Sequence, residues 1–281
     1  MLKATILFVS IFTYSFVNSQ SNYINYHLLC YQAKVFISEQ KYDSANVVFK
    51  EAFELVDFIH ESNLKTAQRS AQKSKDLEFD TFCQEKLNNI NDNINETFKH
   101  KIDSIQTLDQ KVRTRKHIKA RNYLTRCLRD TSYQPKPKKY QRSQEIFEVW
   151  RNTDSTNIEC FKKLIHQYGY PSEQKVGARS NHLATIVLLH YDKDTANHVM
   201  GEILHEALLA GEIPPKDYAW IIDRHLLNAG QKQRYFTIPT ILRPLTEEEK
   251  RYFNQNRKEI GMDPVENVKI KVKRNAVLIS G

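Results

Sequence analysis

Glycine and proline are missing from the first 134 residues of this 281-residue chain, since the first proline is Pro135 and the first glycine is Gly169. About 12% of an average sequence is glycine or proline, so roughly 16 such residues would be expected over this length. Both residue types stop helices, and β-hairpins depend on residues that tolerate positive φ. The absence argues against a β-rich N-terminal half and predicts that it is helical.

The scarcity of glycine also excludes several catalytic motifs. The chain contains no G-x-S-x-G, no phosphate-cradling glycine loop and no dinucleotide fingerprint. It has ten histidines, but His205-Glu206 is followed by Leu209 where a zinc protease has its second histidine. We therefore expect no metal site and no cofactor.

Cysteine is scarce as well. Cys30, Cys83, Cys127 and Cys160 are far apart and form no C-x-x-C pair. A secreted context permits disulfides, yet nothing in this spacing demands them. Cys30 and Cys83 fall on apolar stripes of predicted helices, where a free cysteine behaves as a small hydrophobe. Buried thiols are the favoured interpretation, and disulfides remain the alternative.

The one apolar run that could enter a membrane is at the N-terminus. Lys3 gives a positive start, residues 4–17 are apolar but short for a span, and residues 17–19 suit a cleavage point before Gln20. This pattern predicts a signal peptide over residues 1–19 and an exported, periplasmic or secreted protein of the bacterial envelope. The alternative is a buried N-terminal helix.

Positive charge is concentrated in one segment. Between Lys99 and Arg142 there are 14 Lys and Arg residues against three Asp, a balance of +11 beside +9 for the whole chain. With its proline-lysine stretch, the segment predicts a basic loop over about residues 113–145. It is either a solvated surface or a binding site for a polyanion. Export argues against nucleic acid and favours an anionic lipid or glycan as the partner.

Residues 20–100 carry the pattern of helical hairpins. Two helices are predicted between Tyr23 and Asp57, with the small residues Ala33 and Ala45 where the helices approach closely. The spacing resembles a tetratricopeptide repeat, a 34-residue helix-turn-helix unit. One period later Ala67 again fits, whereas a bulky residue, Phe79, replaces the second alanine. The resemblance implies stacked hairpins whose groove binds a protein partner.

The second half is predicted as further helices with clear ends. One ends at Gly169, others cover residues 181–191, 194–210 and 215–230, and Thr246 with Glu249 forms a capping box for the last. The tail alternates polar and apolar residues at 268–272, a strand-like signal. The overall prediction is an all-α protein of tetratricopeptide-like hairpins followed by a multi-helix domain over residues 101–281.

Three groups of residues in that second part carry a further resemblance. They are Asp109-Gln110-x-x-Arg113, Tyr168-Gly169-Tyr170-Pro171 and Asp223-Arg224 followed by Gln233, Tyr235 and Thr237. Together they resemble an uncharacterised bacterial family of helical proteins, a domain of unknown function, over about residues 101–268. In that pattern Phe236 stands where the family has glycine, and Ile238 where it has glutamine. The resemblance implies a helical fold and little chemistry.

The same residues provide the candidates for a site. His190 could act as acid and base with Asp192 or Asp223 orienting it, while Arg113 or Arg224 binds an anionic group. The further ligand-binding candidates are Asp109, Gln110, Gln233 and Tyr235. Alternatively, these charges form buried ion pairs that fix helix packing.

Two functions are therefore open. The first is protein–protein interaction, or scaffolding, through the helical hairpins. The second is ligand binding or catalysis by polar residues of the second part. An aromatic-lined groove over residues 23–90 favours the first function, and a cleft where the polar residues converge favours the second.

Overall fold

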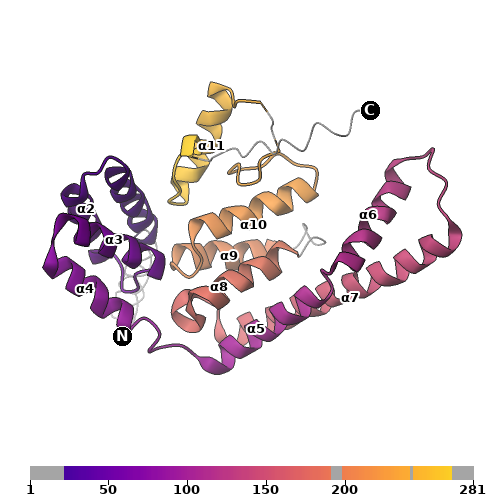
Figure 1. Cartoon of the computed structure of the whole chain (residues 1–281), viewed down its shortest axis with the longest axis horizontal. Helices are drawn as coiled ribbons and strands as arrows, with labels where there is room; N and C mark the ends of the chain where they lie inside the picture. The colour runs from indigo at the N-terminus through magenta and orange to yellow at the C-terminus, as the bar shows by residue number, and fades with distance from the viewer. Residues whose placement is uncertain (1–21, 191–197, 241–242, 268–281) are drawn as a thin grey trace, which may run out of the picture. The chain divides into compact units, whose positions relative to one another are not determined.

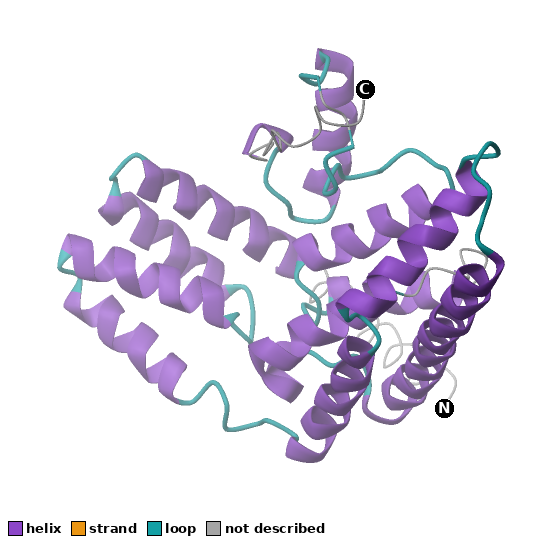
Figure 2. Cartoon of the chain, turned by 45° about the vertical axis from the view of Figure 1, so that its right-hand side comes forward, coloured by secondary structure: helices purple, strands orange, loops and turns teal. Residues whose placement is uncertain are grey.

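A computed structural model describes residues 22–190, 198–240 and 243–267. These residues form helices joined by turns, and no strand occurs among them (Figure 2). The all-α prediction is therefore confirmed. Two expectations, the signal peptide over residues 1–19 and the strand over 268–272, lie outside the described residues.

The chain divides into two compact units. One is formed by residues 93–194, and the other combines the described residues of 1–92 and 195–281. This division differs from the linear one into residues 20–100 and 101–281, because the C-terminal helices pack with the N-terminal ones.

The N-terminal hairpins consist of a helix over residues 22–38, α2 (Tyr42–Glu54), α3 (Glu61–Ser74) and α4 (Leu77–Asn88). Helix α3 packs between α2 and α4 (Figure 1). Ala33, Ala45 and Ala67 are fully buried, as expected for small residues where helices approach closely. In the absence of glycine, the turns before α2 and α4 place Gln40 and Lys75 in the left-handed region, at φ 61° and 63°.

The same unit contains α9 (His198–Leu209), α10 (Pro215–Asn228), α11 (Glu247–Glu259) and the short 3-10 helix η1 (Val265–Asn267). The capping box of Thr246 and Glu249 begins α11 as predicted. Helices α9 and α10 pack against each other.

Two glycines let these C-terminal elements approach the first helix. A Cβ on Gly211 would lie 2.2 Å from the ring of Tyr23, and one on Gly261 would lie 3.0 Å from the carbonyl oxygen of Ile24. Both glycines also have positive φ, 70° and 78°. A larger residue is excluded at Gly211 by sterics and disfavoured at both positions by backbone conformation. Glycine in the second half therefore permits packing on the glycine-free first half.

The unit of residues 93–194 contains α5 (Glu96–Lys111), α6 (Arg115–Arg129), α7 (Pro137–Tyr168) and α8 (Glu173–Leu189). Helix α5 packs on α7 and α8, and α6 lies along α7 (Figure 1). The apolar stripe of Phe98, Ile102 and Ile105 on α5 is buried. A kink at Gly177, where φ is 79°, interrupts α8.

The expectation of a basic loop over residues 113–145 is wrong for most of that segment. Residues 115–129 and 137–145 are helical, and only residues 113–114 and the short connection over residues 130–136 are not. Arg and Lys are good helix formers, and Ala120, Tyr123 and Leu124 give α6 a buried face. Charge on the surface does not prevent a helix when a narrow apolar face can pack.

Candidate functional site

The last turn of α5 places a buried carboxylate beside a guanidinium. Arg113 follows the C-cap of the helix, four residues after Asp109, and its Nη1 lies 3.0 Å from Asp109 Oδ1. The same nitrogen donates to the backbone oxygen of Asp109 at 2.8 Å. Gln110 donates from Nε2 to the other carboxylate oxygen, Oδ2, at 2.8 Å. The side chain of Asp109 is 1% exposed, so these contacts replace its hydration.

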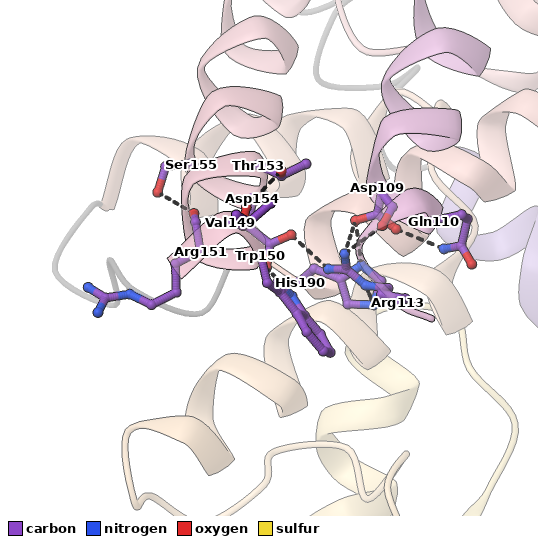
Figure 3. A network of polar contacts seen from close by, with 10 residues as sticks. All are labelled: Asp109, Gln110, Arg113, Val149, Trp150, Arg151, Thr153, Asp154, Ser155 and His190. Carbon is purple, nitrogen blue, oxygen red and sulfur yellow. Dashed lines mark hydrogen bonds and ion pairs between the residues drawn. The ribbon is translucent and has the colours of Figure 1, made fainter. Parts of the chain in front are cut away.

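His190, at the end of α8, completes this arrangement (Figure 3). Its Nδ1 lies 2.9 Å from Asp109 Oδ1, and Arg113 donates from Nε to its Nε2 at 3.3 Å. A carboxylate only accepts, so Nδ1 carries the proton, and an Nε2 that accepts from Arg113 is unprotonated. The side chain of His190 is 30% exposed.

Helix α7 contributes a second carboxylate. Arg113 donates from Nη2 to Asp154 Oδ1 at 2.9 Å, and Trp150 donates from Nε1 to Asp154 Oδ2 at 2.8 Å (Figure 3). The guanidinium of Arg113 also lies 5.1 Å from the centre of the Trp150 ring. Arg113 thus joins α5, α7 and the end of α8.

The charges of this cluster (Asp109, Arg113, Asp154 and His190) do not balance. Two carboxylates face one guanidinium, and burial raises the pKa of Asp154 although Arg113 opposes that shift. The cluster can therefore accept one more positive charge from an outside group. Chemically it is an Asp–His pair with a guanidinium at the same imidazole, a combination used in acid–base chemistry.

The structure brings together four sequence candidates: Asp109, Gln110, Arg113 and His190. The carboxylate that orients His190 is Asp109, not Asp223, while Asp192 lies outside the described residues. Sequence reasoning missed Asp154 and Trp150. Their spacing of four residues in a long amphipathic segment was the available signal, but it does not show which helix they face.

Asp223, on α10, has a different role, since it organises the loop that follows. Its Oδ1 accepts from the backbone nitrogens of Arg234 and Tyr235 at 2.8 and 2.9 Å. Its Oδ2 accepts from the backbone nitrogen and hydroxyl of Thr237 at 2.7 and 2.8 Å. Gln233 closes the same loop, because its amide exchanges hydrogen bonds with the backbone of Ile238. Every polar atom of these two side chains takes part in the hydrogen bonds of the loop.

The rest of that loop is also packed inward. Tyr235 is 3% exposed, burial raises the pKa of its hydroxyl, and its backbone oxygen accepts from Arg257 at 2.9 Å. Phe236 has φ 54°, in the region that favours glycine, yet its ring is buried against Phe253. Here a core contact offsets the backbone strain. Arg224 leaves Nε buried without a hydrogen-bond partner in the described part of the chain.

A pocket lies on the N-terminal hairpins, between α2, the α2–α3 connection and α4, and is named here the α2–α4 pocket. Its volume is about 410 Å³, in the range of ligand sites. Phe53 and Phe79 are buried at its base, and Phe82 is 36% exposed, with ring centres 6.4 and 6.0 Å from those two. Its charged lining consists of Lys50, Glu54, Asp57, Glu78 and Lys86.

The described residues contain neither a metal-binding cluster nor a membrane-spanning helix. No group of three or more His, Cys, Asp or Glu side chains in this part of the chain is arranged to hold a metal ion. Among the same residues, no helix is long and apolar enough to cross a membrane.

Residues 140–278 match a family of unknown function (DUF6624). The match contains His190, Asp223 and Gln233, but begins after Asp109 and Arg113, so half of the charged cluster lies outside it. No curated protein and no solved structure matches the chain.

Proposed function

We propose that the protein is an exported interaction protein that binds a partner protein through the α2–α4 pocket. The observation that carries this proposal is the partly exposed Phe82, stacked on two buried phenylalanines in an open pocket. Aromatic side chains in pockets contribute most of the binding energy of many interfaces. Stacked helical hairpins, with their tetratricopeptide-like spacing, are a common support for such surfaces.

The location of the pocket follows from how the unit packs. Gly211 and Gly261 pack closely against the start of the first helix. The C-terminal part of the chain therefore covers that part of the N-terminal hairpins. The pocket lies open between α2 and α4, the second helices of the two hairpins. A partner would therefore bind α2 and α4 rather than the first helix.

The charge of the pocket lining favours a basic partner segment. Lys50 is paired with Asp76 at 2.9 Å, whereas Lys86 forms no ion pair within the described part of the chain. Glu54, Asp57 and Glu78 form no ion pair among the described residues. An excess of negative charge around an apolar base suits a segment with an aromatic or large aliphatic anchor next to Lys or Arg.

Selection from a library of random peptides displayed on phage tests this proposal on the purified mature chain. We expect the selected peptides to combine an aromatic or large aliphatic residue with a nearby Lys or Arg. Phe82→Ser should weaken binding of a selected peptide at least about tenfold, since burial of one large apolar side chain is worth roughly 1.5–3 kcal/mol.

The matched control is Val47→Ser, which removes an apolar side chain that is 65% exposed and does not line the pocket. It should bind like the unchanged protein. Thermal unfolding of both variants shows whether the fold is intact. Peptides that bind the Phe82 variant and the unchanged protein equally would contradict the proposal.

Export is a separate element of the proposal, and it rests on the pattern of residues 1–19. Expression of the full chain in a bacterium, followed by fractionation and mass spectrometry, should find a mature form that starts at Gln20. A protein that keeps Met1 and stays in the cytoplasm would contradict export.

A second candidate function is binding of a small cationic group, with acid–base chemistry, at the charged cluster. The specific observation in its favour is that two carboxylates, Asp109 and Asp154, share one guanidinium beside the partly exposed His190. Nuclear magnetic resonance of the histidine ring with methylammonium as the probe tests it. Methylammonium should shift the His190 signals in the unchanged protein and have no effect in Asp154→Asn. Absence of a shift in the unchanged, folded protein would favour a packing role.

A further inference from the structure

Helix α6 and the first turns of α7 form a hairpin over residues 115–142, called here the basic hairpin. Only one acidic residue, Asp130, occurs in it, and its one ion pair is to Arg126 at 4.0 Å. All of its ten Lys and Arg residues are exposed: Arg115, Lys116, Lys119, Arg121, Arg126, Arg129, Lys136, Lys138, Lys139 and Arg142. A solvated helix face ordinarily intersperses both signs, and this one does not.

Aromatic contacts hold the hairpin in shape. The hydroxyl of Tyr123 accepts from the backbone nitrogen of Lys136 at 3.1 Å and ties the end of α6 to the start of α7. The Nζ of Lys139 lies 4.2 Å from the centre of the Tyr123 ring, and the guanidinium of Arg126 lies 4.3 Å from that of Tyr133. These contacts position cations without neutralising them, so the surface is preorganised for an outside anion.

The basic hairpin also exposes apolar side chains. Leu128 is 76% exposed and Ile118 is 39% exposed, both on α6 among the charged residues. A soluble polyanion such as a sulfated glycan gains nothing from these side chains. A lipid surface can bind both features, because anionic headgroups attract the cations while apolar side chains enter the boundary with the acyl chains.

We infer that the basic hairpin binds the surface of a bilayer that contains anionic phospholipids. This partner is distinct from the protein partner proposed for the α2–α4 pocket, which lies in the other compact unit. The protein would then attach to a membrane by one unit and present its pocket with the other.

Sedimentation with vesicles tests the inference on the mature full chain. One set contains phosphatidylglycerol in phosphatidylcholine and the other contains phosphatidylcholine alone. We expect binding to the first set only, and weaker binding as salt is raised, since salt screens the attraction. An attraction of about 1 kcal/mol for each basic residue is roughly a fivefold change in partitioning.

The charge variant replaces Lys119, Arg126, Arg129 and Lys138 by Gln. It should reduce partitioning roughly 100- to 1,000-fold. The matched control replaces four exposed cations outside the hairpin by Gln, namely Lys73, Lys163, Arg251 and Lys258. It changes the net charge equally and should retain most of the binding. A third variant, Leu128→Ser, keeps every charge and should reduce binding about threefold to tenfold at fixed salt.

Three results would overturn the inference. They are equal binding to the uncharged vesicles, equal losses in the charge variant and its control, and retention on heparin without any binding to anionic vesicles, which would identify a glycan instead. Circular dichroism of each variant checks that helix content is unchanged. If the charge variant is unfolded, Leu128→Ser alone decides, because a side chain that is 76% exposed does not support the fold.

Discussion

Replacing Asp223 by alanine gives a direct test of whether this residue holds a loop or serves a site. Its side chain is fully buried and accepts four hydrogen bonds from Arg234, Tyr235 and Thr237. Alanine removes every acceptor at once. The loop of residues 234–237 then loses its main attachment to α10.

The expected loss of stability follows from those four donors. A hydrogen bond to a charged group contributes roughly 1.5–3 kcal/mol, and a buried donor left without a partner costs about 1–3 kcal/mol. The backbone nitrogen of Tyr235 is buried, whereas the donors of Arg234 and Thr237 are partly buried and can reach water. The nitrogen of Tyr235 therefore bears the full cost of losing its hydrogen bond, and the other three donors bear only part of it. We expect Asp223→Ala to lower the free energy of unfolding by about 4 kcal/mol.

The asparagine variant refines this expectation. Asn keeps one oxygen, which can still accept from Arg234 and Tyr235. Its NH₂ group can donate to the Thr237 hydroxyl, but the backbone nitrogen of Thr237 loses its acceptor. We expect a loss of about 2 kcal/mol for Asp223→Asn, half the effect of alanine.

Urea denaturation followed by tryptophan fluorescence measures both variants. Trp220 lies on α10, in the same unit as Asp223, and Trp150 lies in the other unit. A Trp150→Phe background therefore makes the fluorescence report on the unit that contains Asp223. Glu248→Ala, which removes an exposed acid of α11, is the control and should stay within about 0.5 kcal/mol. A loss below about 1 kcal/mol for Asp223→Ala would refute the reasoning and leave Asp223 open to a role in a site.

Two further predictions concern buried titratable groups. Burial, with His60 and Lys34 nearby, holds the pKa of His27 well below 6.5, so the unfolded chain takes up a proton that the folded chain does not. The free energy of unfolding should therefore fall by up to about 1.4 kcal/mol per pH unit below about pH 6.5, and unfolding curves of His27→Gln should show a smaller slope. Burial also raises the pKa of Cys83 to about 12, so a thiol reagent at neutral pH should modify the exposed Cys160 and spare Cys83. Peptide mass mapping checks this, and rapid labelling of Cys83 in the folded protein would contradict it.

Much of the fold was predictable because its signals are local. The apolar stripe on α5 and the capping box of α11 depend on residues within one or two helical turns of each other. The prediction of buried thiols at Cys30 and Cys83 was confirmed for the same reason. The prediction of a loop in the basic segment was wrong because only a few apolar residues, among them Tyr123 and Leu124, carry its helical pattern among many charged ones.

The candidate site was predictable only in part. Asp109 lies in the last turn of α5 and Arg113 directly follows the end of that helix, so their pairing is a local contact over four residues. His190 is 81 residues from Asp109, and its partner depends on how α5 and α8 pack. The prediction that Asp223 orients His190 is wrong, because Asp109 holds that imidazole and Asp223 accepts from the loop that follows it.

The sequence by itself determined that the protein is helical, since the first 134 residues lack the two residue types that end helices and form tight turns. It also determined that one segment carries the excess positive charge. The tertiary structure decided which charges meet, which aromatic rings stay exposed beside α2 and α4, and that Phe236 tolerates a positive φ. The physical reason is that helix formation depends on neighbours in sequence, whereas these contacts depend on the packing of helices far apart in the chain.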